Sequence, residues 1–187
     1  VYRFEYVWEN MIDYVFGEAP KDHFFPHARW HLIGGPTGGT QSSALEPDTI
    51  IIRDNNAYIL DAKYYKYGIT RYIGDLPHTD SIQKQITYGE YLRSPNSRVP
   101  TGQSKDYDEI YNAFIMPFDC NGSEDKYEFV GIATADWKDS QYNYEKVVGL
   151  LLDTRHLIES YARYNLREID RIIQKIENEA NNYPLIK

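Results

Sequence analysis

Two short apolar runs separated by a polar turn constrain the fold of this chain more than any other feature of its sequence. The first run covers Thr49 to Ile52, the second covers Ala57 to Leu60, and Asp54-Asn55-Asn56 lies between them. β-branched residues favour strands, and Asp and Asn tolerate the left-handed backbone that tight hairpin turns need. The segment from Pro47 to Lys63 therefore predicts a β-hairpin.

This hairpin would gather three charged side chains at one end. Residues two apart on a strand share a face, so Asp61 and Lys63 point the same way. Asp48 begins the first strand, just after Pro47, and antiparallel pairing brings it opposite the end of the second strand. The pattern predicts two carboxylates and one ammonium close together at a sheet end.

Such a cluster suits a divalent cation. Two neighbouring carboxylates repel each other unless a cation or a proton lies between them. Mg²⁺ binds through one or two carboxylates, keeps several waters and accepts a substrate phosphate. We expect Asp48, Asp61 and the backbone carbonyl of Ala62 to hold the ion, and Lys63 to orient and help deprotonate an attacking water and to stabilise charge on the phosphate.

The alternative is a solvated sheet end without chemistry. Acidic-x-Lys triplets also occur at Glu124-Asp125-Lys126 and Asp136-Trp137-Lys138, and the second follows an apolar run. What distinguishes the hairpin is its upstream half, because Pro47-Asp48 is the only Pro-Asp pair in the sequence. On the residues alone, a nuclease site and a solvated sheet end both remain open.

The rest of the chain predicts a single domain over residues 1–187. Apolar spacing favours helices over 3–17, 81–93 and 142–180, the last with a break near 161–165. Strands are expected over 110–118 and 127–135, and loops over 18–46 and 94–108, with a short strand at Arg29–Ile33. This order gives an α/β (α+β) fold, a central mixed sheet flanked by helices.

Composition narrows the class of protein further. A single cysteine, Cys120, excludes an internal disulfide and favours a reducing cytoplasm. No apolar run is long enough for a membrane helix, so no membrane association is expected. The net charge of −8 conflicts with unaided DNA binding, which normally requires excess Lys and Arg.

The hairpin pattern resembles a known nuclease motif. Pro47-Asp48, twelve residues and then Asp61-Ala62-Lys63 is similar to the motif of the PD-(D/E)XK nuclease superfamily. The longer block from Ile59 to Gly68, followed by Asp80 to Gln85, resembles the cleavage region of LlaJI-like type II restriction endonucleases. The segment Trp8-Glu9-Asn10-Met11 resembles the leading helix of that family.

The resemblance implies a restriction-endonuclease-like fold, a prokaryotic cytoplasm and cleavage of double-stranded DNA with Mg²⁺, for which Mn²⁺ can substitute. It implies metal binding by Asp48, Asp61 and the Ala62 carbonyl, with Lys63 assisting the water. Glu9 matches an acidic residue that acts as an outer metal ligand in many members, although an exposed helix charge is an equal alternative. Four polar residues are candidates for a second shell or for DNA contact: Gln83, Gln85, Lys66 and Arg71. The usual Gln-x-x-x-Tyr spacing is not kept after either glutamine, which weakens a direct role for both.

Size, acidic charge and the lack of a recognition module suggest division of labour. The chain resembles the small catalytic subunits of heterodimeric, type IIS restriction or nicking endonucleases, in which a larger partner recognises the site. A homodimeric enzyme with recognition loops in 18–46 or 94–108 is the near alternative. Two others are a non-catalytic interaction module that keeps the nuclease fold and a metal enzyme acting on a small molecule.

His23, His27 and His31 form a second possible metal-binding pattern. Their spacing of four would align them on a helix, but Pro26 lies among them and argues against one. A metal site at these histidines is therefore not expected.

Overall fold

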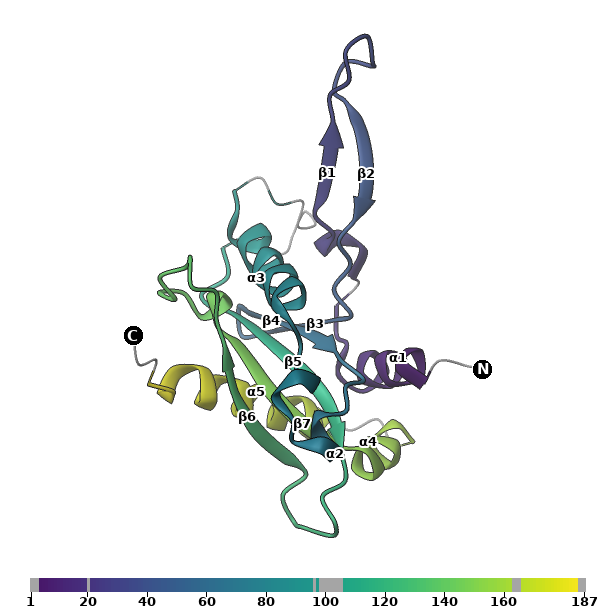
Figure 1. The fold of residues 1–187 in the computed structure, drawn as a ribbon, viewed down its shortest axis with the longest axis vertical. Coiled ribbons are helices and arrows are strands. Elements are labelled where there is room, and N and C mark those ends of the chain that lie inside the picture. The colour runs from purple at the N-terminus through teal and green to yellow at the C-terminus, as the bar shows by residue number, and fades with distance from the viewer. Residues whose placement is uncertain (1–3, 20, 96, 98–105, 163–165, 185–187) are drawn as a thin grey trace.

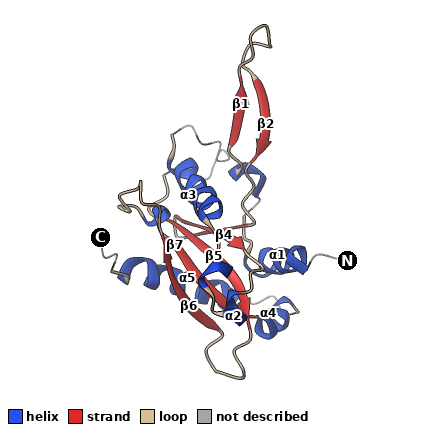
Figure 2. Ribbon diagram, viewed as in Figure 1, coloured by secondary structure: helices blue, strands red, loops and turns tan. Residues whose placement is uncertain are grey.

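The computed structural model describes residues 4–19, 21–95, 97, 106–162 and 166–184. Five strands form a mixed sheet with helices packed on both faces, and a separate two-stranded ribbon projects from this body (Figure 1). Figure 2 shows the sheet in red between the helices. The elements in chain order are α1 Phe4–Phe16, η1 Lys21–Phe24, β1 His27–Trp30, β2 Thr40–Ala44, β3 Thr49–Arg53, β4 Asn56–Ala62, α2 Tyr67–Thr70, η2 Ile73–Asp75, α3 Thr79–Arg93, β5 Ile110–Phe118, β6 Tyr127–Ala133, η3 Asn143–Glu145, β7 Val147–Asp153, α4 Thr154–Tyr161 and α5 Leu166–Asn182.

The strand order in the main sheet is β3-β4-β5-β7-β6. The two outer pairs, β3 with β4 and β6 with β7, are antiparallel, whereas β4, β5 and β7 run parallel to one another. The predicted mixed sheet flanked by helices is therefore confirmed. The carboxyl ends of the three parallel strands meet at one edge of the sheet, where ligand sites commonly form in α/β folds.

Each face of the sheet has its own core. Helices α1, α4 and α5 cover one face, where Trp8, Leu157 and Ile172 pack with Leu60 and Leu150. Helix α3 covers the other face through Ile86, Tyr88 and Leu92. Because Ile59 packs on the α3 side and side chains alternate, Asp61 also lies on that face.

The predicted hairpin is confirmed as β3–β4. Its turn residues, Asp54 and Asn55, have φ of 50° and 62°, and Arg53 pairs with Asn56 across the turn. Both turn residues thus adopt the left-handed conformation that Asp and Asn accommodate more easily than other non-glycine residues. The hairpin occupies one edge of the sheet, with β3 outermost.

Two predictions were wrong. The segment predicted as helix from residue 142 contains strand β7, because the run Val147–Leu152 is buried on both faces of the sheet and shows no two-residue alternation. The predicted loop over 18–46 contains the β1–β2 ribbon. The short strand expected at Arg29–Ile33 overlaps β1, whereas β2 was missed because its polar sequence Thr-Gln-Ser-Ser-Ala lacks an apolar face. Helix α4 ends at Tyr161 and α5 begins at Leu166, on either side of the break predicted near 161–165. Residues 163–165 of that break lie outside the described residues, and so do residues 98–105 of the loop predicted over 94–108.

Within the described ranges, every helix is too short or too polar to span a lipid bilayer.

Candidate active site

Strand register places the two predicted acidic residues opposite each other. Thr49 pairs with Leu60 in the β3–β4 ladder, so Asp48 faces Asp61 one position further along. Asp48 Oδ2 accepts a hydrogen bond of 2.8 Å from the main-chain amide of Ala62. The hairpin therefore brings together the two acids that the spacing predicted.

Asp48 is also held from its backbone side. Lys21 Nζ donates to the Asp48 carbonyl oxygen at 2.7 Å and to Asp13 Oδ2 at 2.7 Å. The Thr49 hydroxyl donates to the other carboxylate oxygen of Asp13 at 3.2 Å. Helix α1 and Lys21 thus clamp the start of β3, a role that sequence reasoning missed because no local pattern links these residues.

Asp61 and Lys63 form an ion pair inside the protein. Asp61 is only 1% exposed, and its Oδ2 lies 2.6 Å from Lys63 Nζ. The second oxygen of Asp61, Oδ1, is buried and has no hydrogen-bond partner among the described residues. Buried polar atoms are rarely left unpaired, so an unpartnered carboxylate oxygen beside a second acid is suited to a cation.

Burial and the neighbouring acid shift the protonation of Asp48. Burial and the neighbouring Asp61 raise the pKa of Asp48 to about 7, against the lowering effect of the Ala62 amide and of Lys63. Burial alone would lower the pKa of Lys63, but the Asp61 carboxylate outweighs it and the pKa of Lys63 is raised. Lys63 therefore stays positively charged, while Asp48 readily holds a proton in the absence of a cation.

Glu9 reaches the same region from helix α1. Trp8 anchors this helix, because its buried indole nitrogen donates a 3.0 Å hydrogen bond to the Ile115 carbonyl of β5. Partial burial and the Asp61 charge raise the pKa of Glu9 by more than the Lys63 charge lowers it. The charges of Glu9, Asp61 and Lys63 therefore interact. No group of three His, Cys, Asp or Glu side chains in the described part of the chain is arranged to hold a metal together, so Glu9 lies near the acid pair without completing a three-residue ligand set.

Helix α3 carries both predicted glutamines and two further residues near the acids. Gln85 is fully buried and donates to the Ile59 carbonyl at 2.7 Å, so it braces β4 and does not face solvent, whereas Gln83 is exposed.

The hydroxyl of Tyr88 is buried without a partner among the described residues, and Asp61 and Asp48 add to the effect of burial in raising its pKa. Lys84, which interacts with Glu9, lies 5.7 Å from the Tyr88 ring centre. Sequence reasoning missed Lys84 and Tyr88 as neighbours of the acids, although their spacing of four places them on one helix face.

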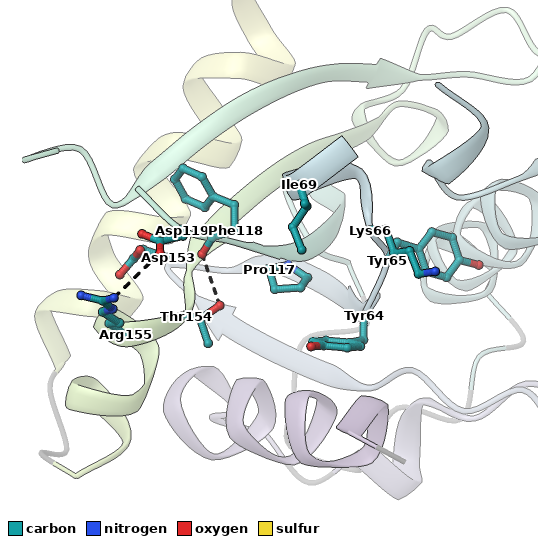
Figure 3. A pocket seen from close by; sticks show the side chains of 10 residues that line it. All are labelled: Tyr64, Tyr65, Lys66, Ile69, Pro117, Phe118, Asp119, Asp153, Thr154 and Arg155. Atoms are coloured by element: carbon teal, nitrogen blue, oxygen red, sulfur yellow. Dashed lines mark hydrogen bonds and ion pairs between the residues drawn. The ribbon is translucent and has the colours of Figure 1, made fainter. Parts of the chain in front are cut away.

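The two predicted basic residues after the motif, Lys66 and Arg71, have surroundings of their own. Arg71 donates to Glu128 on β6 at 3.0 Å and packs against the Tyr67 ring, so its charge is directed away from Asp61. Lys66 is exposed and lines a cavity of about 320 Å³ at the carboxyl ends of β4, β5 and β7. Figure 3 shows this cavity, which is lined by Tyr64, Tyr65, Lys66, Ile69, Pro117, Phe118, Asp119, Asp153, Thr154 and Arg155. None of the predicted metal ligands lines this cavity, so it is distinct from the site formed by the two acids.

The histidine pattern does not form a site among the described side chains. His27 and His31 are exposed on the ribbon and the loop beyond it, and the side chain of His23 lies outside the described set. The short 3-10 helix η1 ends at Phe24 and β1 begins at His27, so the described chain has no helix through Pro26, in agreement with the argument from that proline.

Comparison with protein families identifies the chain. The family model described as LlaJI restriction endonuclease matches residues 1–153. The chain belongs to the LlaJI restriction endonuclease family. The match covers most of the chain and includes every predicted site residue, from Glu9 on α1 to Gln85 on α3. Restriction endonucleases cleave DNA, so this LlaJI-family chain has a DNA-cleaving restriction function. A comparison with curated proteins finds no match.

Proposed function

We propose that this LlaJI-family protein is an Mg²⁺-dependent endonuclease of the PD-(D/E)XK type that hydrolyses phosphodiester bonds of double-stranded DNA. One observation carries the proposal. Asp48 and Asp61 face each other across the β3–β4 hairpin, with the Lys63 ammonium 2.6 Å from Asp61 and the other Asp61 oxygen unpartnered in the described structure.

The residues fit a small, hard cation. Asp61 Oδ1 and the Asp48 carboxylate would hold Mg²⁺ together with the Ala62 carbonyl, and Glu9 would act as an outer ligand. When bound, the ion would activate a water molecule and polarise the scissile phosphate, and Mn²⁺ would serve in its place. The Ala62 amide keeps one Asp48 oxygen in position, so binding needs little reorganisation of the chain.

Lys63 has a separate role. Its ammonium is half-buried beside Asp61, where a positive charge acts in a poorly screened environment. We infer that it orients the attacking water and offsets the negative charge that develops on the phosphate oxygens. The raised pKa of Lys63, which follows from the Asp61 carboxylate, favours this charged role over the deprotonating role expected from the sequence.

Replacement of Asp61 tests the proposal. Asp61→Asn keeps the side-chain shape but removes the charge, and strand cleavage with Mg²⁺ should fall by about a thousandfold or more. Asp136→Asn is the matched control, because Asp136 is exposed and belongs to the other acidic-x-Lys triplet that follows a strand. Cleavage that persists in Asp61→Asn while circular dichroism shows a native fold would exclude the assignment of the active site to Asp61.

We also propose that the chain cuts one strand as part of a heterodimer whose larger subunit recognises the DNA site. The net charge of −8 supports this, as do the apolar side chains that α2 and η2 expose, including Ile69 (86% exposed) and Ile73 (76%). The purified chain should not cut a defined sequence until a restriction subunit encoded beside it is added. Cutting of both strands at a defined site by the chain alone would favour a homodimer.

A further inference from the structure

The β1–β2 ribbon is the most exposed part of the described fold. It extends away from the sheet and its helices (Figure 1), and none of residues 25–46 is buried. The Leu45 amide donates to the Pro26 carbonyl at 3.0 Å and closes the base of the ribbon. Isolated two-stranded hairpins are marginally stable in water, so an element of this kind is expected to gain order from a surface that it binds.

The charge of the ribbon is opposite in sign to that of the chain. Residues 23–45 contain no Asp or Glu, although the chain has 28 acidic residues, and they include Arg29 and three histidines. Arg29 donates only to Gln41, at 3.4 Å, and forms no ion pair with any described residue. In contrast, Arg53, Arg71 and Arg171 each face a carboxylate. The ribbon therefore presents an unneutralised cation in an otherwise acidic protein.

The two faces of the ribbon differ. His27, Arg29 and Gln41 share one face, because Gln41 contacts the other two side chains. Trp30 follows Arg29 and so points to the opposite face, where it is 68% exposed. Arginine and glutamine are the donors that read phosphates and base edges, and an exposed indole can pack on sugars or bases.

We propose that the β1–β2 ribbon binds a groove of the double-stranded DNA that the active site cuts. The major groove is about 12 Å wide and admits a two-stranded ribbon. The end of β2 at Ala44 leads within four residues to Asp48, so a seated ribbon would hold the duplex next to the acid pair. The lack of acidic residues removes the repulsion that the phosphates of DNA meet elsewhere on this acidic chain. This inference rests on the proposed DNA-cleaving function and assigns DNA positioning to a specific element.

Binding of a fluorescent mixed-sequence duplex, measured by anisotropy at several salt concentrations with Ca²⁺ in place of Mg²⁺, tests the inference. The double variant Arg29→Gln/Trp30→Ala should bind about tenfold more weakly, with a salt dependence reduced by about one ion. The matched control Arg155→Gln/Trp137→Ala changes an exposed arginine and an exposed tryptophan elsewhere and should bind like the parent. Because the ribbon lies outside the core, the melting temperature of the ribbon variant should not change.

Equal duplex affinity of the parent and the ribbon variant, including no binding by either at low salt, would overturn the inference. Normal duplex binding combined with loss of association with a partner subunit would also overturn it and make the ribbon a protein-docking element. The proposed catalytic function is tested separately, because Asp61→Asn should lose cleavage and keep ribbon-dependent binding. Loss of ribbon dependence would therefore not be confused with failure of the acid pair.

Discussion

The carboxylate of Asp48 and the main-chain amide of Ala62 are joined by a 2.8 Å hydrogen bond across the β3–β4 hairpin. This contact ties the first acid to the strand that carries the second acid and the lysine. The separation of the charged groups is therefore set by strand register and a backbone donor, with little freedom left to the side chain of Asp48. A site built on paired strands holds its geometry better than one built on a loop.

The stability of the metal-free protein should depend on Asp48 and fall as pH rises. Its pKa is near 7 in the folded chain and near 3.8 in an unfolded one, because burial and Asp61 disfavour its charged form. The folded state then holds more protons between these values, so the free energy of unfolding decreases from about pH 4 to about pH 7, by on the order of 2–4 kcal/mol. Urea denaturation across this range measures the slope. Asp48→Asn should flatten it, whereas the exposed control Asp136→Asn should not, and an unchanged slope in Asp48→Asn would contradict the prediction.

Magnesium binding should strengthen as pH rises through about 7. The same proton that stabilises the metal-free Asp48 must leave before the carboxylate can bind a cation, so proton and metal compete. Titration calorimetry at about pH 6 and about pH 8 should show tighter Mg²⁺ binding at the higher pH, by about tenfold. Asp61→Asn should abolish binding at both values. Equal affinity at the two pH values would mean that Asp48 is not a ligand.

Removal of the Lys63 charge should reduce cleavage without abolishing the fold. Lys63→Met leaves the buried Asp61 unpaired, so the free energy of unfolding should fall by about 1–3 kcal/mol and the cleavage rate by about a hundredfold or more. Single-turnover cleavage and urea denaturation measure the two effects. Lys66→Met is the matched control three residues away, on an exposed side chain. A cleavage rate that falls equally in both variants would indicate general loss of DNA attraction, contrary to a specific role for Lys63.

Lys21 should act at a distance from the chemistry through the backbone of Asp48. Lys21→Met removes the donors to the Asp48 carbonyl and to Asp13, which should cost about 1 kcal/mol of stability and lower the cleavage rate about tenfold. Because Lys21 only positions Asp48, DNA affinity should be unchanged. Lys175→Met, which breaks a surface pair with Glu179, provides the control. Weaker DNA binding with a normal cleavage rate would instead place Lys21 against the substrate.

Sequence alone predicted the hairpin and its charged end because both depend on local information. Turn preference at Asp54 and Asn55 and the two-residue alternation of strands determine the register that brings Asp48 opposite Asp61. The helix over Phe4–Phe16 is equally local, since its buried residues recur at helical spacing. In these segments the chemistry follows from neighbours in sequence.

Strand β7 shows where local information failed. A continuous apolar run such as Val147–Leu152 is compatible with either a buried strand or a buried helix. Only the parallel neighbour β5 and the antiparallel neighbour β6, which both hydrogen-bond to this segment, make it a central strand. The second strand of the ribbon was missed for a related reason, since β2 has no apolar face that would mark it as a strand.

What the sequence by itself determined was the pair of acids, the lysine beside them and the strands that carry them. The tertiary structure decided which other groups surround them. Trp8 brings Glu9 to the acids, Lys21 clamps the Asp48 backbone, and α3 places Tyr88 nearby, whereas Arg71 is drawn away to Glu128. These contacts join residues that are far apart in the chain. They form because the helices pack on the sheet, and no local spacing in the sequence encodes that packing.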